Sequence, residues 1–134
     1  MKAFLTVLFI SLTMGMQAQD SLSVEYKLLK GVHMVDQGHK IHFEEVISDS
    51  RCPKDVTCVM AGWAMIKVNL IESGDNNPQS IEVKIPATMH PRIMPVLFEN
   101  ENGQMLVANL SPYPLSTEKF ENREYCLELL WIAN

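Results

Sequence analysis

Two cysteines placed close together have the clearest chemistry in this chain. Cys52 and Cys58 have five residues between them, and Pro53 stiffens the segment that they bound. Thiols this close in sequence join readily in an oxidising compartment. A zinc site needs about four ligands, and no second cysteine pair is present to supply them. The spacing therefore predicts a Cys52–Cys58 disulfide that staples one loop.

Several polar and aromatic residues surround this predicted ring. Asp49, Ser50 and Arg51 precede it, Lys54 lies within it, and Trp63 follows it. They form our candidate binding loop, because loops on a rigid scaffold often carry recognition. A structural role remains open for two of them, since Asp49 can cap a turn and Arg51 can pair locally. Trp63 lies on the less uniformly apolar face of its segment, and we expect it to be exposed.

Imidazole and thioether side chains offer a second chemistry, the binding of copper. The residues concerned are His33, Met34, His39, His42, Met89 and His90. His39 and His42 would point to opposite faces of a strand, so they converge only if the chain turns between them. Solvated histidines and core-filling methionines explain the same residues. Copper binding therefore stays an alternative, and we expect no cofactor.

The remaining chemical groups give no indication of catalysis. The chain has no nucleophile elbow, HExxH motif, phosphate-binding glycine loop or triad order, so we do not expect an enzyme. Glu44 and Glu45 are adjacent, so their side chains would diverge on a strand. A change in the parity of the apolar residues around them indicates a β-bulge.

Cys126 is the third cysteine and has no predicted partner within the chain. On a strand it would face the same side as its charged neighbours Glu124 and Glu128. A buried inert thiol and a dimer linked through Cys126 both remain open.

The amino terminus indicates the compartment. Lys2 precedes an uncharged, largely apolar run that ends at Ala18 and is too short to span a membrane. Residues 1–18 are predicted to be a signal peptide cleaved after Ala18, with cleavage after Gly15 as the alternative. No cysteine lies near the junction to be lipidated. We expect residues 19–134 to be a single secreted or periplasmic domain, with no stable membrane insertion after cleavage.

The net charge of the chain limits the classes of molecule that it is expected to bind. The 134 residues include 11 Lys and Arg against 16 Asp and Glu, which gives a net charge of −5. Phosphate backbones are bound by clustered basic residues, so nucleic acid is excluded as a partner. An unknown protein or a small-molecule ligand remains.

Alternation of apolar and polar residues with period two predicts the elements that hold these groups. About seven strands are expected, at residues 24–28, 40–47, 59–71, 81–85, 93–99, 104–110 and 125–131. Turn residues separate them, including Asp36-Gln37-Gly38; Asn102-Gly103 is expected to form the centre of a type I′ hairpin turn. Only residues 116–123 suit a short helix, with Ser116 or Thr117 as N-cap. The pattern predicts an all-β fold, an antiparallel β-sandwich that is Ig-like or related.

One segment resembles a known group of proteins. The run Asp49-Ser50-Arg51-Cys52-Pro53, followed by Cys58, Val59, Ala61 and Gly62, is similar to a motif of small secreted bacterial proteins of uncharacterised function. Those proteins also tend to carry a Pro-Tyr-Pro element, which matches residues 112–114. They usually have Trp two residues after the second Cys, where this chain has Met60. The resemblance implies a secreted β-sandwich-like domain and no particular activity.

Taken together, these features predict a non-catalytic binding or structural module that uses loops near the Cys52–Cys58 ring. Copper binding is the alternative. A third hypothesis is inhibition of an extracellular protease, in which Arg51 or Lys54 enters a trypsin-like acidic pocket.

Overall fold

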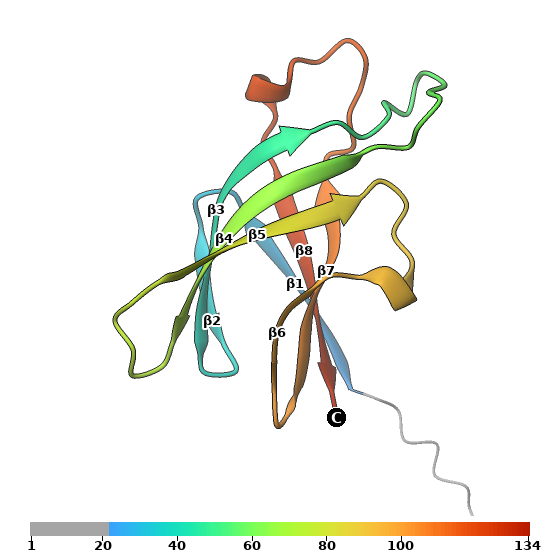
Figure 1. Ribbon diagram of the computed structural model, residues 1–134. Helices are drawn as coiled ribbons and strands as arrows, with labels where there is room; N and C mark the ends of the chain where they lie inside the picture. Colours follow the sequence, from blue (N-terminus) through green and yellow to red (C-terminus); the bar gives the residue numbers. More distant parts are fainter. Residues whose placement is uncertain (1–21) are drawn as a thin grey trace, which may run out of the picture.

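The computed structural model describes residues 22–134, which form two β-sheets packed face to face (Figure 1). The eight strands of this region are β1 (Ser23–Leu29), β2 (His33–Asp36), β3 (His39–Asp49), β4 (Trp63–Glu72), β5 (Gln79–Pro86), β6 (Val96–Asn100), β7 (Gly103–Ser111) and β8 (Cys126–Ala133). One sheet has the order β1-β8-β7-β6 and the other β2-β3-β4-β5, and every neighbouring pair is antiparallel. The predicted signal peptide lies outside the described residues.

The predicted fold class is confirmed. The chain is all-β, with two antiparallel four-stranded sheets and a disulfide between Cys52 and Cys58. The eighth strand is β2, whose four residues are too few to show a period. Gln37 and Gly38 connect it to β3 with φ of 48° and 76°. Positive φ at both central residues is what a type I′ hairpin turn requires.

Alternating side chains of the two sheets meet in one core. In β8 the inward residues are Leu127, Leu129 and Trp131, and in β4 they are Ala64, Ile66, Val68 and Leu70. Burial of these apolar side chains supplies the main stabilising free energy of the sandwich. Among the described residues, no helix is long and apolar enough to cross a membrane.

The predicted bulge in β3 is confirmed, whereas the turn predicted before β7 is displaced. The β3–β4 register shifts between Phe43 and Glu45, where the parity of the apolar residues changes. In the β6–β7 hairpin Asn100 pairs with Gly103, so the connecting residues are Glu101 and Asn102. A Cβ on Gly103 would overlap the Ile132 carbonyl oxygen. Gly103 is therefore required by close packing against β8, and the prediction of a central Asn102-Gly103 pair was wrong.

Three predicted boundaries also change. The strand expected from residue 59 begins at Trp63, and the one expected from residue 93 begins at Val96, after the 3-10 turn Pro91–Ile93. In the segment 116–123 only Phe120–Asn122 is helical, as a 3-10 turn whose N-cap, Lys119, makes no side-chain cap hydrogen bond. Ser116 is not an N-cap, because its amide and hydroxyl both bond to Asp55.

Strand β8 provides a test of which face is buried. Leu127 is fully buried, while Leu29, on the neighbouring strand β1, is exposed. We expect Leu127→Ala to lower the free energy of unfolding by about 2–5 kcal/mol, because it leaves a cavity in the core. The control Leu29→Ala should change it by less than about 0.5 kcal/mol. Urea denaturation measures both values, and equal losses would contradict the inward orientation of Leu127.

Candidate functional site

The candidate site lies at the end of the sandwich where β3 ends and β4 begins. The Cys52–Cys58 disulfide closes a ring in the loop 50–62, and the Cα atoms of the two cysteines are 5.8 Å apart. The loop 112–125, which joins β7 to β8, reaches the same end of the molecule (Figure 1). Two long loops that are distant in sequence therefore share this end.

Arg51 fastens these two loops together. It is only 3% exposed, and its Nη1 donates to the carbonyl oxygen of Leu110 at 2.7 Å. Its Nη2 donates to the carbonyl oxygen of Pro112 at 3.2 Å, and the Tyr113 ring lies over the guanidinium, 4.7 Å from its carbon to the ring centroid. A buried guanidinium must have its donors satisfied, and these carbonyls satisfy them. Arg51 therefore holds the Pro-Tyr-Pro segment in place and does not line the surface.

Asp49 supplies the counter-charge beneath the ring. Its carboxylate accepts hydrogen bonds from Arg51 Nε at 2.8 Å and Nη2 at 2.7 Å, and from the Tyr125 hydroxyl at 2.8 Å. Arg123 Nη1 lies 3.6 Å from the same carboxylate. Burial favours a raised pKa for Asp49, but the hydrogen bonds from Arg51 and Tyr125 and the charge of Arg51 outweigh it, so its pKa lies below the usual value.

Tyr125 completes this group, which we name the buried ion cluster: Asp49, Arg51, Arg123 and Tyr125. The Tyr125 hydroxyl donates to Asp49 and accepts from Arg123 Nη1 at 3.2 Å. Burial raises the pKa of Tyr125; the hydrogen bond from Arg123 opposes this change and the Asp49 carboxylate adds to it. The hydroxyl therefore stays protonated and remains a donor to Asp49.

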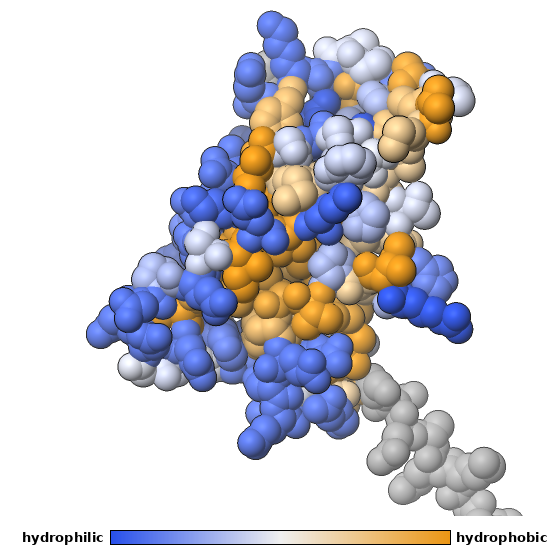
Figure 2. Space-filling model, viewed as in Figure 1, coloured by the Kyte–Doolittle hydropathy of each residue, from blue (hydrophilic) through white to orange (hydrophobic). Residues whose placement is uncertain are grey.

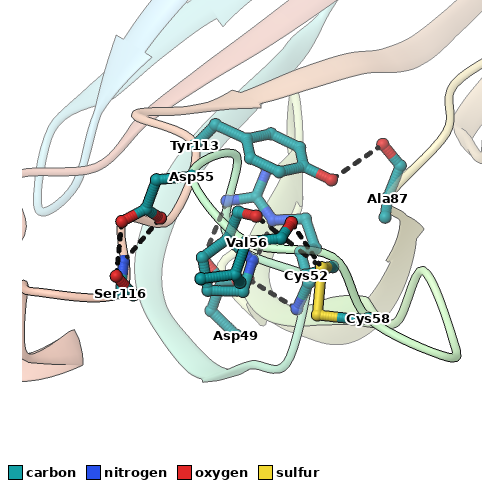
Figure 3. The surroundings of a disulfide bond; sticks show 10 residues. Asp49, Cys52, Asp55, Val56, Cys58, Ala87, Tyr113 and Ser116 are labelled. Atoms are coloured by element: carbon teal, nitrogen blue, oxygen red, sulfur yellow. Dashed lines mark hydrogen bonds and ion pairs between the residues drawn. A yellow bond between two sulfur atoms is a disulfide. The ribbon is translucent and has the colours of Figure 1, made fainter.

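Further contacts fix one side of the ring to the loop 112–125. Lys54 N donates to the Pro114 carbonyl oxygen at 3.1 Å, and the Asp55 carboxylate accepts from both the amide and the hydroxyl of Ser116 (Figure 3). The Tyr113 hydroxyl also donates to the Ala87 carbonyl oxygen at 3.4 Å. The ring is thus held by its own disulfide and by contacts to a second loop.

The ring and the two residues that follow it present apolar side chains to solvent. Val59 is fully exposed, Met60 is 69% exposed, and Val56 is partly exposed. We name these three residues the apolar tip. Figure 2 shows hydrophobic atoms at the upper right, where Figure 1 draws this loop. Val59 and Met60 were not predicted as site residues, because the apolar alternation placed residue 59 in a strand. Gly62, a strand-breaking residue close behind them, was the signal for a loop.

The remaining members of the predicted binding loop are placed separately. Ser50 is exposed and its hydroxyl donates to the Trp63 carbonyl oxygen at 2.8 Å, which closes the base of the loop. Lys54 is exposed within the ring. Trp63 is exposed, as predicted, with the Lys84 Nζ 4.0 Å from its ring centroid. Trp63 and Lys54 are therefore available to a partner at this end, whereas Asp49 and Arg51 lie beneath the ring.

The candidate copper ligands do not gather into one site. His39 stacks on Phe98 with ring centroids 4.0 Å apart, and His90 Nδ1 accepts a hydrogen bond from the Arg92 amide. Met34 and Met89 pack against the core. Only His33 and His42 are brought together, as partners in the β2–β3 register. Within residues 22–134, no group of three or more His, Cys, Asp or Glu side chains is arranged to hold a metal ion.

The buried ion cluster predicts an acid-sensitive contribution to stability. We expect Asp49→Asn to lower the free energy of unfolding by about 3 kcal/mol at neutral pH, because two guanidinium groups lose their carboxylate. The wild-type contribution is complete above the unfolded pKa of about 3.9 and is lost as the pH falls through the lower folded pKa. Urea denaturation from neutral pH to about pH 2 should therefore show the two proteins converging. The control Asp55→Asn, at an exposed carboxylate, should lose less; a constant difference for Asp49→Asn would contradict the assigned ion pair.

Gly62 at the base of the loop provides a second test. Its φ is +74°, and a Cβ at this position would overlap the Ser50 carbonyl oxygen. Gly74 has a φ of +95° with nothing within 4 Å of its Cβ position. We expect Gly62→Ala to cost about 3 kcal/mol, from backbone strain plus steric overlap, and the control Gly74→Ala to cost about 1 kcal/mol, from strain alone. Thermal unfolding compares them, and equal losses would show that the loop base is not closely packed.

No protein-family model, curated protein or solved structure matches the chain. The motif resemblance drawn from residues 49–62 and 112–114 therefore stays a prediction.

Proposed function

We propose that this chain is an exported, non-catalytic binding module that contacts a protein partner through the apolar tip, Val56, Val59 and Met60. The observation that carries this proposal is the full exposure of Val59 beside Met60 on a loop that is cross-linked and tied down at its base. Apolar side chains that the chain itself leaves uncovered are available for burial against another surface.

The energetics of such a contact favour a protein surface. Complete burial of a Val or Met side chain yields about 1.5–3 kcal/mol. This gain is normally reduced by the entropy lost when a flexible loop becomes ordered on binding. Here the disulfide, the Lys54 to Pro114 hydrogen bond and the Asp55 to Ser116 contacts order the loop before any partner arrives. More of the gain is therefore retained as affinity.

The chemistry beneath the tip supports binding in preference to catalysis. The buried ionisable residues next to the ring, Asp49 and Arg51, bond to each other, and the Tyr113 ring lies against the guanidinium. Their donors and acceptors are engaged in holding the two loops. The same burial disfavours the protease-inhibitor hypothesis for Arg51, because its guanidinium would have to leave Leu110 and Pro112 to enter an acidic pocket.

Export is part of the same proposal. An intramolecular disulfide is typical of proteins that fold in an oxidising compartment. The predicted signal peptide at residues 1–18 would deliver the chain there. A secreted or periplasmic partner is accordingly the class we propose.

Site-specific photo-crosslinking in the native cell tests the proposal. A photoreactive amino acid at position 59 should give one dominant protein adduct. The same group at position 35 should give none, because Val35 is exposed on β2 near the opposite end of the sandwich. Adducts of the same protein from both positions, or no adduct from position 59, would contradict the proposal.

The captured protein then permits a quantitative comparison. We expect Val59→Ser with Met60→Ser to weaken its binding by about tenfold or more, with no loss of folding stability, because the chain leaves both side chains largely uncovered. Val35→Ser is the matched control and should bind as the wild type does. Isothermal titration calorimetry measures these affinities, and an unchanged affinity for the double variant would show that the apolar tip is not the contact.

A further inference from the structure

Two histidines lie directly opposite each other on adjacent strands, away from the candidate binding loop. The antiparallel register pairs His33 of β2 with His42 of β3. The chain has four histidines in all. Half of the histidines therefore lie opposite each other on one sheet, although they are nine positions apart in the sequence.

Hydrogen bonding shows which kind of pair they form. The Phe43 amide donates to the Val32 carbonyl oxygen at 3.2 Å, so the ladder bond lies at the Val32–Phe43 position. Bonded and non-bonded pairs alternate along an antiparallel ladder. His33 and His42 are therefore a non-hydrogen-bonded pair, in which the Cβ atoms are about 4.5–5.5 Å apart and the side chains are closest.

Both imidazoles belong to the outer face of sheet β2-β3-β4-β5. The neighbours of His42 along β3, Ile41 and Phe43, are fully buried and point into the core. Side chains alternate along a strand, so His42 points outward. The neighbour of His33, Met34, packs against the core, and His33 itself is exposed. The two rings thus share one solvent-facing side of the sheet.

The charged surroundings of the pair are mixed. Lys40 and Glu44 lie two residues to either side of His42 on the same face, and Asn69 is its partner on β4. The Glu44 carboxylate accepts from Asn69 Nδ2 at 2.7 Å and lies 3.5 Å from the Lys67 Nζ. One carboxylate therefore pairs with one lysine on this face, and the two imidazoles supply its ring nitrogens.

We propose that His33 and His42 form a two-histidine site for a divalent transition metal ion. Imidazole nitrogen is a preferred ligand of Cu(II), Ni(II) and Zn(II), and the affinity of such sites is highest for Cu(II). The two imidazoles provide two coordination positions from adjacent strands, and water fills the others. A bound ion links β2 to β3 and thereby stabilises the hairpin.

Calorimetric titration of the purified protein with Cu(II) tests this proposal. We expect saturable binding of one equivalent in the micromolar range. His33→Ala and His42→Ala should each weaken it by about a hundredfold, because a two-ligand contact is reduced to one. His90→Ala is the matched control, since His90 is exposed at a different place in the fold, and it should bind as the wild type does.

Thermal unfolding separates metal binding from damage to the fold. Without metal, His33→Ala and His42→Ala should unfold at the wild-type temperature, and Cu(II) should raise the unfolding temperature of the wild type and of His90→Ala only, each compared with the same protein without metal. Absence of saturable binding, or wild-type affinity in the double variant His33→Ala with His42→Ala, would overturn the proposal. Neither result bears on the apolar tip, which is in a different part of the molecule.

Discussion

The bidentate pairing of Arg51 with Asp49 joins chain segments that the two sheets alone would leave separate. The guanidinium donates hydrogen bonds to the carbonyl oxygens of Leu110, at the end of β7, and of Pro112. The carboxylate accepts a hydrogen bond from the hydroxyl of Tyr125, just before β8. Removing either charge would leave the other buried without its bidentate partner, which is far more costly than losing an exposed pair. Through Arg51, the Asp-Ser-Arg-Cys-Pro segment and the Pro-Tyr-Pro segment of this chain are in direct contact.

The position of the apolar tip depends on that pairing. The ring lies next to Arg51 in sequence and bonds to the loop that Arg51 holds, through Lys54 and Asp55. The disulfide closes the ring itself, and Gly62 lets the returning chain pass close to Ser50. Loss of the buried pair would therefore remove contacts from both loops at once. Stability and the proposed recognition are coupled here, because the same contacts that hold the fold also limit the shapes of the loop.

Local features of the sequence were sufficient to predict the fold class, the disulfide and the bulge in β3. Each depends on residues close in sequence: alternation along one strand, two cysteines in one loop, and a parity change at Glu44-Glu45. The burial of Arg51 was beyond such reasoning, because its carbonyl partners are 59 and 61 residues away. The displaced turn before β7 has a similar origin, since Gly103 is required by its approach to Ile132 on another strand.

The histidine pair also could not be predicted from residues close in sequence. Parity along β3 correctly separates His39 from His42, and His39 indeed stacks on Phe98 between the sheets. Parity within one strand says nothing about which residue of a neighbouring strand lies opposite. That register is set by the hairpin turn, whose two central residues both have positive φ. A slip of one residue would turn His33 toward the core and Met34 toward solvent, so the turn at Gln37 and Gly38 is what brings the two imidazoles to one face.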